Sequence, residues 1–209
     1  MNEPTFLGQW ALFDTLHTDT AGTNYRAGLL VDRQVKERRM LTEVSPCFTR
    51  QEAVWKRVRI LLEGIGKSNI RQLHSPESIE EVEGRTLLVY PLIPGRSLDD
   101  VLQKAAGRGL PIHFDLALSL LIAISDILDI GSSIVVSGKK SFHGFLTPDN
   151  IVVAYDGTVY LKNYGIAPYL DRDDEIYSCL TARYPETLPP EVRNRQGLGP
   201  QADIWHLGQ

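Results

Sequence analysis

The stretch SFHGFLTPDNIVVAYDGTVYLKNYGIA, residues 141–167, carries the clearest local pattern of this chain. Two short runs rich in β-branched residues, 151–153 and 159–161, flank the dipeptide Asp156-Gly157. An Asp-Gly pair favours a tight turn, because both residues tolerate a positive φ. The pattern predicts a β-hairpin, followed by a loop rich in proline and charge that ends at the helical pattern QADIWHLG, residues 201–208.

The longest apolar stretch, FDLALSLLIAISDILDI at residues 114–130, lies before this hairpin. Asp115, Asp126 and Asp129 interrupt it, and charged side chains are costly in a bilayer core. The stretch therefore predicts a buried helix of a globular protein. A shorter helix, SLDDVLQKAA, is expected just before it.

The first part of the chain favours a small antiparallel sheet with one helix. Short apolar groups alternate with turns such as HTDTAGTN, residues 17–24. Thr49 and Glu52 have the spacing of a capping box ahead of a helix. Its apolar stripe comprises Val54, Val58, Leu61, Leu62 and Ile65 and ends near Gly64 and Gly66.

A second hairpin is predicted in IEEVEGRTLLVYPLI, residues 79–93, with Glu83 and Gly84 in the turn. Pro94 and Gly95 then break the pattern, and the elements change from mainly strands to mainly helices. We therefore expect a domain boundary near Ile93, with one region at 1–93 and the other at 94–209.

Composition narrows the class of protein. The chain has 209 residues, 43% of them hydrophobic, a formal net charge of -4 and only two cysteines, Cys47 and Cys179. A mildly acidic chain does not attract phosphates or anionic lipids, so no nucleic-acid partner and no membrane insertion are expected. The cysteines lack metal-ligand spacing, and the N-terminus lacks a signal-peptide pattern, so a cytoplasmic location is expected.

Six short motifs, in the right order, resemble those of protein serine/threonine kinases, particularly bacterial ones. HGFLTPDNIVV is similar to the catalytic loop and NYGIA to the Asp-Phe-Gly-Ile-Ala magnesium loop. The others are SNI at 68–70, LLVYPLIPGRSL at 87–98 as the hinge, LPPEV at 188–192 and ADIWHLG at 202–208. The resemblance implies an α+β bilobal fold, with an antiparallel-sheet N-lobe and helix C at 1–93 and a mainly helical, incomplete C-lobe at 94–209. It also implies that Asp203 binds the backbone of the catalytic loop.

The same resemblance shows which reactive groups are replaced. Thr42 stands at the position of the lysine, Phe145 at that of the base aspartate, Thr147 at that of the catalytic-loop lysine and Asn163 at that of the magnesium-binding aspartate. The helix C glutamate position falls near Arg57 or Val58. Phosphoryl transfer depends on positioned charge, so these losses predict the absence of ordinary kinase turnover.

A few positions retain features that the family uses for nucleotides. Gly22 alone of the three glycine positions is a glycine, and the hinge positions Tyr90, Pro91 and Ile93 keep their main-chain groups. With Asn150 and Asn163 they form the expected nucleotide-contacting set. Arg26, Arg38 or Arg39 could replace the missing lysine charge, or could simply be exposed surface residues.

The resemblance therefore implies a pseudokinase that acts as a signalling interaction or regulatory module for a protein partner, such as an active kinase. No cofactor is required; ATP could bind at the hinge, and magnesium is not expected. A nucleotide sensor and a weak or atypical kinase stay open as alternatives. The chain could be one region of a longer protein, and its loop residues Tyr169, Tyr177, Ser178 and Thr181 could be phosphorylated or be ordinary exposed residues.

Overall fold

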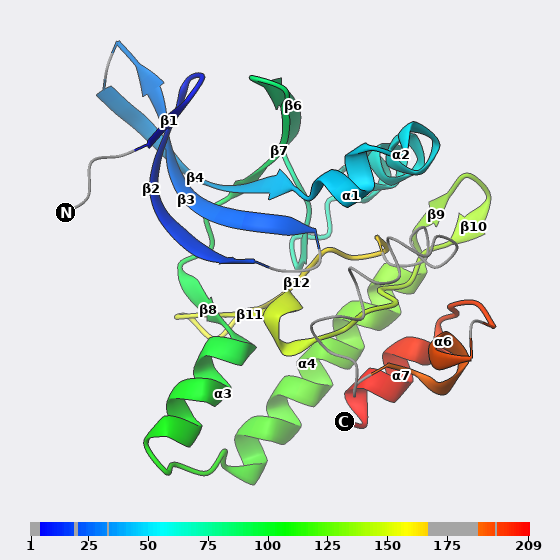
Figure 1. Cartoon of the computed structure of the whole chain (residues 1–209). Coiled ribbons are helices and arrows are strands. Elements are labelled where there is room, and N and C mark those ends of the chain that lie inside the picture. Colours follow the sequence, from blue (N-terminus) through cyan, green and yellow to red (C-terminus); the bar gives the residue numbers. More distant parts are fainter. Residues whose placement is uncertain (1–4, 19–20, 33, 167–187, 195) are drawn as a thin grey trace. The chain divides into compact units, whose positions relative to one another are not determined.

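A computed structural model describes residues 5–18, 21–32, 34–166, 188–194 and 196–209 (Figure 1). It divides into two compact units. Unit 1 comprises residues 1–55 and 76–93, and unit 2 comprises residues 56–75 and 94–209. One division falls between Ile93 and Pro94, where the domain boundary was expected. However, residues 56–67, most of the helix expected in the N-lobe, group with unit 2. The lobe boundaries remain a prediction, and each unit is described by itself.

Unit 1 is built on a six-stranded antiparallel sheet. In sheet order its strands are β1 (Thr5–Leu7), β2 (Trp10–Thr18), β3 (Gly22–Val31), β4 (Gln34–Val44), β7 (Arg85–Pro91) and β6 (Ser78–Val82). A short helix, α1 (Pro46–Thr49), follows β4. The hydrophobic core of the unit consists of Leu7, Trp10, Leu12, Ala27, Leu41, Leu87 and Val89. These residues come from five strands, so the core holds most of the sheet together.

The sheet curls until its two edges touch. The indole Nε1 of Trp10 donates to Glu80 Oε2 at 2.9 Å, and the main-chain N of Gly8 donates to Glu83 Oε1 at 3.3 Å. A Cβ on Gly8 would lie 2.6 Å from a methyl group of Val82, so this close approach requires glycine. The turn between β1 and β2 therefore meets the β6–β7 hairpin, although β1 and β6 are at opposite ends of the strand order.

Both predicted hairpins are confirmed. Glu83 and Gly84 connect β6 to β7 with φ values of 51° and 74°, which suit the mirror-image turns of tight hairpins. In the second, β11 (Ile151–Ala154) pairs antiparallel with β12 (Val159–Lys162). The main-chain N of Thr158 donates to Asp156 Oδ1 at 2.9 Å, which stabilises the turn.

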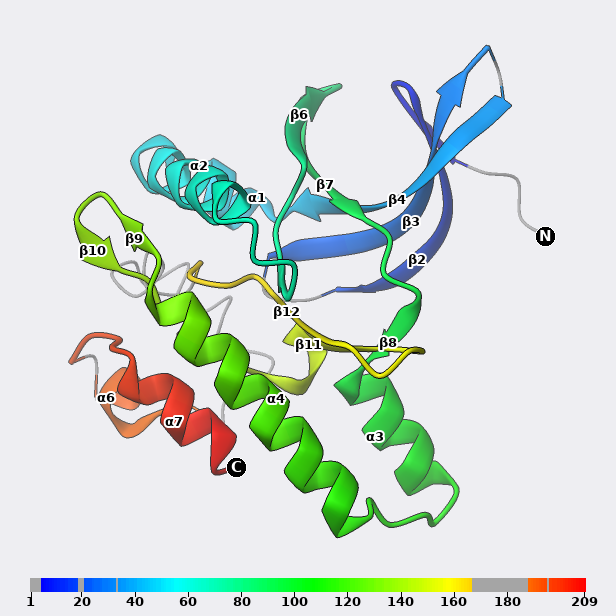
Figure 2. The same cartoon turned by 180° about the vertical axis from the view of Figure 1, so that it is seen from behind.

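Unit 2 contains a four-stranded sheet in the order β5-β12-β11-β8, with helices around it (Figure 2). The remaining strands of the unit are β5 (Leu73–His74), β8 (Gly95–Ser97), and the paired β9 (Val135–Val136) and β10 (Lys139–Lys140). Its helices are α3 (Leu98–Gly107), α4 (Phe114–Ser132), the 3₁₀ turn η1 (Pro148–Asn150), α6 (Pro190–Arg193) and α7 (Gln201–Leu207). Helix α2 (Glu52–Lys67) begins in unit 1 and continues into unit 2.

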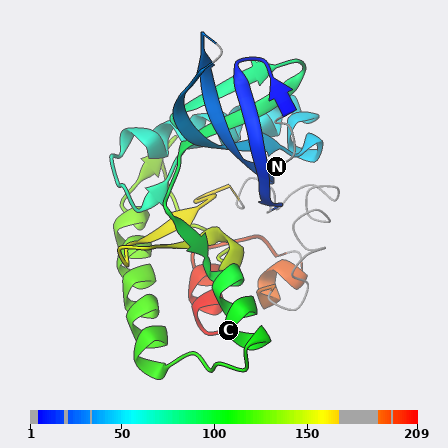
Figure 3. The same cartoon turned by 90° about the vertical axis from the view of Figure 1, so that its left-hand side faces the viewer.

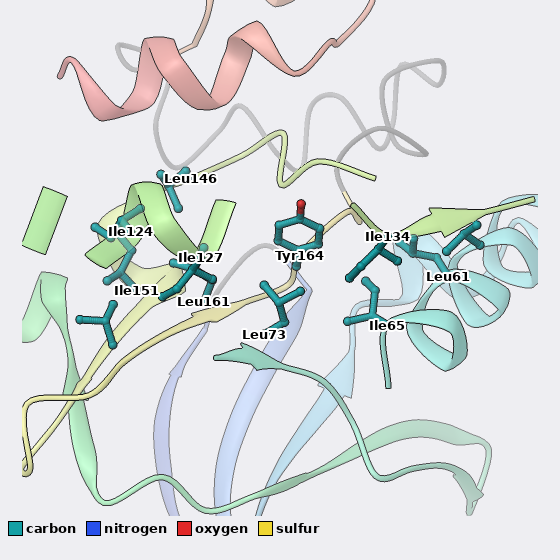
Figure 4. Close-up of a cluster of buried hydrophobic side chains, with 12 residues drawn as sticks. Leu61, Ile65, Leu73, Ile124, Ile127, Ile134, Leu146, Ile151, Leu161 and Tyr164 are labelled. Atoms are coloured by element: carbon teal, nitrogen blue, oxygen red, sulfur yellow. The ribbon is translucent and has the colours of Figure 1, made fainter. Parts of the chain in front are cut away.

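The core of unit 2 joins α2, α4 and the sheet (Figure 4). Leu61 and Ile65 come from α2, Ile124 and Ile127 from α4, and Leu161 from β12. The predicted apolar stripe of α2 is thus largely confirmed. The capping box is wrong: Thr49 is the last residue of α1, α2 begins only at Glu52, and the amides of Val54 and Trp55 bond to the main-chain oxygen of Gln51. The cause is Pro46, which starts a helical turn of its own before α2.

The helix predicted at residues 114–130 is confirmed as α4, but it is buried only in part. Only Ile124, Ile127 and Gly131 are buried in it. Several large apolar side chains of its first turns are exposed, because no described element covers that face. Among the described residues no helix is long and apolar enough to cross a membrane. The loop positions proposed for phosphorylation lie outside the described residues.

Candidate functional site

The segment that resembles a catalytic loop is anchored by one carboxylate. Asp203, in the first turn of α7, accepts hydrogen bonds from the main-chain N of His143 at 2.9 Å and of Gly144 at 2.7 Å. This confirms the contact that the resemblance implied. Burial raises the pKa of the Asp203 carboxyl to about 6, although the two N–H groups lower it. The carboxylate thus fixes the backbone of His143 and Gly144, the two residues directly before Phe145.

His143 is a scaffold residue by its contacts. Its ring is fully buried, with Nε2 2.9 Å from the main-chain oxygen of Lys162, and Nδ1 accepts from the main-chain N of Phe145 at 3.3 Å. These two bonds require a neutral ring that carries its proton on Nε2. Burial lowers the pKa of His143 to about 3, so the ring stays neutral at physiological pH. It holds two neighbouring segments together and has no free nitrogen for proton transfer.

Phe145, which the resemblance places at the position of the catalytic base, points into the protein. Its side chain is buried, and its ring packs edge-to-face on His206 with centroids 5.7 Å apart. The main-chain oxygen of Phe145 accepts a hydrogen bond from Asn150 Nδ2 at 3.0 Å. A phenyl ring cannot accept a proton, so this residue contributes packing and backbone contacts only.

Asn163, which the resemblance places at the position of the magnesium-binding aspartate, hydrogen-bonds to Asn150, the other asparagine of the expected nucleotide-contacting set. Asn163 Nδ2 donates to Asn150 Oδ1 at 2.8 Å. The amide nitrogen of Asn150 donates in turn to Phe145 O and to Thr147 Oγ1, each at 3.0 Å. Asn150 is completely buried, and all three contacts are made within unit 2. An amide N–H therefore stands where a cation would need to meet the Asn150 oxygen.

These residues do not fit a magnesium ion. Mg²⁺ prefers carboxylate oxygens and needs oxygen atoms directed at it, whereas Asn150 and Asn163 offer neutral amides, one of which presents its nitrogen to the other. Within the described residues there is no group of three or more His, Cys, Asp or Glu side chains that could hold a metal.

Sequence reasoning missed Asp149, a further member of this network. Its carboxyl is buried and accepts a hydrogen bond from the Thr147 hydroxyl. Thr147 therefore uses its oxygen both to donate to Asp149 and to accept from Asn150. The spacing Thr-x-Asp before a short 3₁₀ turn could have indicated this contact.

In unit 1, Thr42 is part of a buried polar pair. Its hydroxyl donates to Asn24 Oδ1 at 2.6 Å, and Asn24 Nδ2 donates to the main-chain oxygen of His17 at 3.3 Å. The two residues are direct partners in the β3–β4 register. The hydroxyl of Thr42, the residue that the resemblance places at the lysine position, therefore already has a buried partner. Asn24 was missed because residues 17–24 were interpreted as a turn, whereas β3 already begins at Gly22.

Thr42→Val is expected to lower the free energy of unfolding by about 1 to 2 kcal/mol, because it leaves the buried Asn24 oxygen without this donor. The double variant Asn24→Leu/Thr42→Val should cost clearly less than the sum of the two single changes, since both polar partners are then removed. Urea unfolding of the four proteins measures the coupling. If the losses of unfolding free energy in the two single variants simply added up in the double variant, Asn24 and Thr42 would not be a hydrogen-bonded pair.

The other predicted nucleotide contacts have local structural roles. Gly22 pairs with Val44, and a Cβ on Gly22 would lie 1.9 Å from the main-chain oxygen of Glu43, so strand pairing alone requires the glycine. Tyr90 is buried in β7, Pro91 is its last residue and Ile93 follows it. Because these residues belong to unit 1 and Asn150 and Asn163 to unit 2, their meeting at one nucleotide stays a prediction.

The arginines considered as substitutes for the lysine have surface contacts. Arg26 pairs with Asp14 at 3.3 Å, and Arg39 pairs with Glu37 and Glu77 at 2.6 and 2.8 Å. Arg38 is exposed. On helix α2, Arg57 is exposed and Val58 is buried. Neither an arginine nor a valine carries the carboxylate that would pair with a lysine.

Sequence comparison finds protein kinases, although no family model matches the chain. Serine/threonine-protein kinase PAK 1 of Mus musculus is 33% identical over 70 residues, which are 34% of this chain and 13% of that protein. Serine/threonine-protein kinase fray1 of Dictyostelium discoideum is 23% identical over 210 residues, which are 98% of this chain and 34% of that protein. The chain thus spans 34% or less of the length of these two curated relatives.

Comparison of structures gives the fold. The kinase domain of Mycobacterium tuberculosis PknI, in a double mutant, matches with a TM-score of 0.70 and 16% identity, over 99% of this chain and 75% of that one. Another structure of the PknI kinase domain matches with a TM-score of 0.68 and 15% identity, over 99% and 72% of the two chains. The chain therefore has the protein-kinase-like fold, of class α+β, and the relatives that it resembles in sequence are protein kinases.

Proposed function

We propose that this chain is a catalytically inactive protein-kinase-like domain that works as an interaction or regulatory module. The observation that carries the proposal is the 2.8 Å hydrogen bond from Asn163 to Asn150. Phosphoryl transfer needs metal ions that neutralise the charge of the triphosphate, and in the family these two positions hold them. Here the two side chains bind each other, and neither carries a negative charge.

Phe145, at the position of the catalytic base, removes a second and independent contribution to the reaction rate. A positioned general base contributes typically 10² to 10⁴ in rate, equivalent to about 3 to 5 kcal/mol of barrier. Phe145 cannot supply this contribution, and its ring packs on His206 inside the unit. Restoring one lost group would leave the other absent, so the proposal does not depend on a single substitution.

A domain without catalytic activity acts through the surfaces that it presents to other proteins. The residues that support the fold are in place: Asp203 holds the loop backbone, and His143 joins two segments. A buried network of this kind maintains a defined shape without turnover. The partner we propose is another signalling protein, such as an active kinase, in the cytoplasm.

Purified chain should transfer no phosphate from γ-labelled ATP to itself or to generic protein substrates. The assay compares wild type with Asn150→Ala and Asn163→Ala, and any incorporation that all three share equally comes from a contaminating kinase. Transfer at about 1 s⁻¹ or faster, the ordinary range for kinases, that disappears in Asn150→Ala would overturn the proposal.

A thermal-shift titration with ATP separates the inactive module from a nucleotide sensor. A ligand that binds the folded state raises its stability by RT ln(1 + [L]/Kd). We expect no rise in melting temperature with ATP, with or without Mg²⁺. A rise without Mg²⁺, together with no transfer, would favour a nucleotide-sensing module and would leave the absence of catalysis intact.

A further inference from the structure

The part of α2 that belongs to unit 2 lies in a segment with an excess of positive charge. Residues 56–75 contain five lysines or arginines and one acidic residue, Glu63. The β9–β10 hairpin adds Lys139 and Lys140, which are both exposed. The whole chain has a formal net charge of -4, so these two segments differ in sign from the rest of the molecule. A local concentration of charge favours a ligand of the opposite sign.

The exposed side of α2 and the hairpin meet within unit 2. One stripe of α2 runs along this side at the helical spacing i, i+3, i+7 and i+10, and it consists of Arg57, Ile60, Gly64 and Lys67. Gly64 is the point of contact, because a Cβ on it would lie 2.9 Å from a methyl group of Val136 in β9. The cations of α2 and those of the hairpin therefore border the same contact.

The hairpin is anchored by its turn and by the core. Ser137 and Gly138 connect β9 to β10 with φ values of 51° and 76°, which suit the mirror-image turn of a tight hairpin. Val136 is buried in the core of unit 2, whereas Val135 is exposed. The hairpin follows the end of α4 that lies nearer to α2 (Figure 3). The two lysines after the turn are therefore presented from a supported element.

The basic side chains of this surface are not neutralised by any described residue. In the described part of the chain no ion pair involves Arg57, Lys67, Lys139 or Lys140. Glu63 stands four residues before Lys67 on α2, a spacing that permits an ion pair, but the structure as described contains none between them. The positive charge therefore remains available to a ligand.

We refer to Arg57, Ile60, Lys67, Val135, Lys139 and Lys140 as the α2–β9 surface. We propose that this surface binds an acidic segment of a partner protein, one with an apolar residue between its carboxylates. The four cations would pair with the carboxylates, and the apolar residue would cover Ile60 and Val135, which are 45% and 59% exposed. The inference rests on the proposed function, because it names a surface through which the inactive module acts.

Charge favours this occupant over the alternatives. Two copies of the chain that met through the same surface would bring their cations together, and like charges across an interface oppose association. A nucleic acid or an anionic membrane is a larger array of negative charge, which would also face the acidic remainder of the chain. At physiological salt, charges are screened beyond about 8 Å, so a short acidic segment that touches the surface gains most of the available attraction.

The test uses two synthetic peptides that share a central leucine, one with glutamates around it and the other with glutamines in their place. Fluorescence anisotropy with the whole chain should show the glutamate peptide binding at least about tenfold more tightly at low salt, with a smaller difference at high salt. Arg57→Gln/Lys67→Gln and Lys139→Gln/Lys140→Gln should each weaken this binding at least about tenfold, because each removes half of the cations of the surface.

The matched control is Lys104→Gln/Arg108→Gln, at the end of α3. It removes the same charge from two exposed positions of unit 2 and should leave the affinity for the glutamate peptide unchanged. Urea unfolding should give all three double variants the midpoint of wild type, because every replaced side chain is exposed.

Equal affinity for the two peptides would overturn the proposal, as would binding that survives both substitutions in the surface or that weakens equally in the control. A dimer in sedimentation velocity that Lys139→Gln/Lys140→Gln dissociates would assign the surface to a second copy instead. Binding to vesicles of mixed neutral and anionic lipid that requires the same lysines would assign it to a membrane. None of these results changes the outcome of the phosphate-transfer assay, so the two proposals can fail separately.

Discussion

Asp203→Ala is expected to lower the free energy of unfolding by about 2 to 4 kcal/mol at neutral pH. The variant removes the acceptor of two buried main-chain N–H groups, those of His143 and Gly144. Each buried donor that loses its partner costs about 1 to 3 kcal/mol. The loss is below the full sum, because burial of the carboxylate is itself unfavourable, as its raised pKa indicates.

The size and sign of the change in unfolding free energy show whether the hydrogen bonds of Asp203 or the desolvation of its carboxylate has the larger effect on stability. Guanidinium chloride unfolding should place Asp203→Ala well below wild type, and Asp126→Ala, an exposed aspartate of α4, within about 0.5 kcal/mol of it. Asp203→Asn should fall between them, since its one side-chain oxygen can still accept from one of the two N–H groups. If Asp203→Ala were more stable than wild type, desolvation of the carboxylate would outweigh its hydrogen bonds, and the anchoring role would be wrong.

The fold could be predicted from local patterns that do not depend on distant contacts. The turns at Glu83-Gly84 and Asp156-Gly157 have side chains or glycines that accept a positive φ, so each specifies its hairpin by itself. The apolar spacing of α2 likewise requires only helical periodicity. Motif order then indicated the kinase-like fold, although each motif is short.

The start of α2 and the exposure of α4 could not be predicted in this way. Thr49 satisfies a capping pattern, yet Pro46 begins a separate turn, and the choice between them depends on how β4 enters the helix. An apolar helix such as 114–130 predicts burial, but burial requires a covering element. In the described part of the chain Leu120 packs against the core of unit 2, whereas Phe114, Leu118 and Ile122 stay exposed.

At the candidate site, sequence identified the replaced positions but not the bonds that formed in their place. That Asn163 and Asn150 bind each other depends on a hairpin that brings residues 13 positions apart within 2.8 Å. Thr42 meets Asn24 because of the β3–β4 register, which a single sequence does not specify. Substitutions show which chemistry is lost, whereas the new partners require the three-dimensional pairing of strands.

The dependence of stability on pH is expected to show two buried groups working against each other. His143 has a pKa of about 3 in the folded chain against an ordinary 6.5, so its contribution is present above pH 6.5 and is lost as the pH falls toward 3. Asp203 has a pKa of about 6 against 3.8, so its contribution is present below pH 3.8 and is lost as the pH rises through 6. At 1.36 kcal/mol per pKa unit, the full effects are about 5 and about 3 kcal/mol.

Between about pH 4 and pH 6 the two slopes oppose each other, so the free energy of unfolding of wild type should be nearly flat there and should fall steeply below pH 4. Asp203→Asn removes the carboxyl, and its stability should therefore rise steadily from pH 3 to pH 6.5. His143→Asn removes the imidazole, and its stability should fall from pH 4 to pH 6. The control is His113→Asn at an exposed position, which should keep the wild-type profile. Parallel profiles for wild type and Asp203→Asn would show that this carboxyl does not titrate abnormally, and the account of a desolvated anchor beneath the catalytic-loop segment would have to be abandoned.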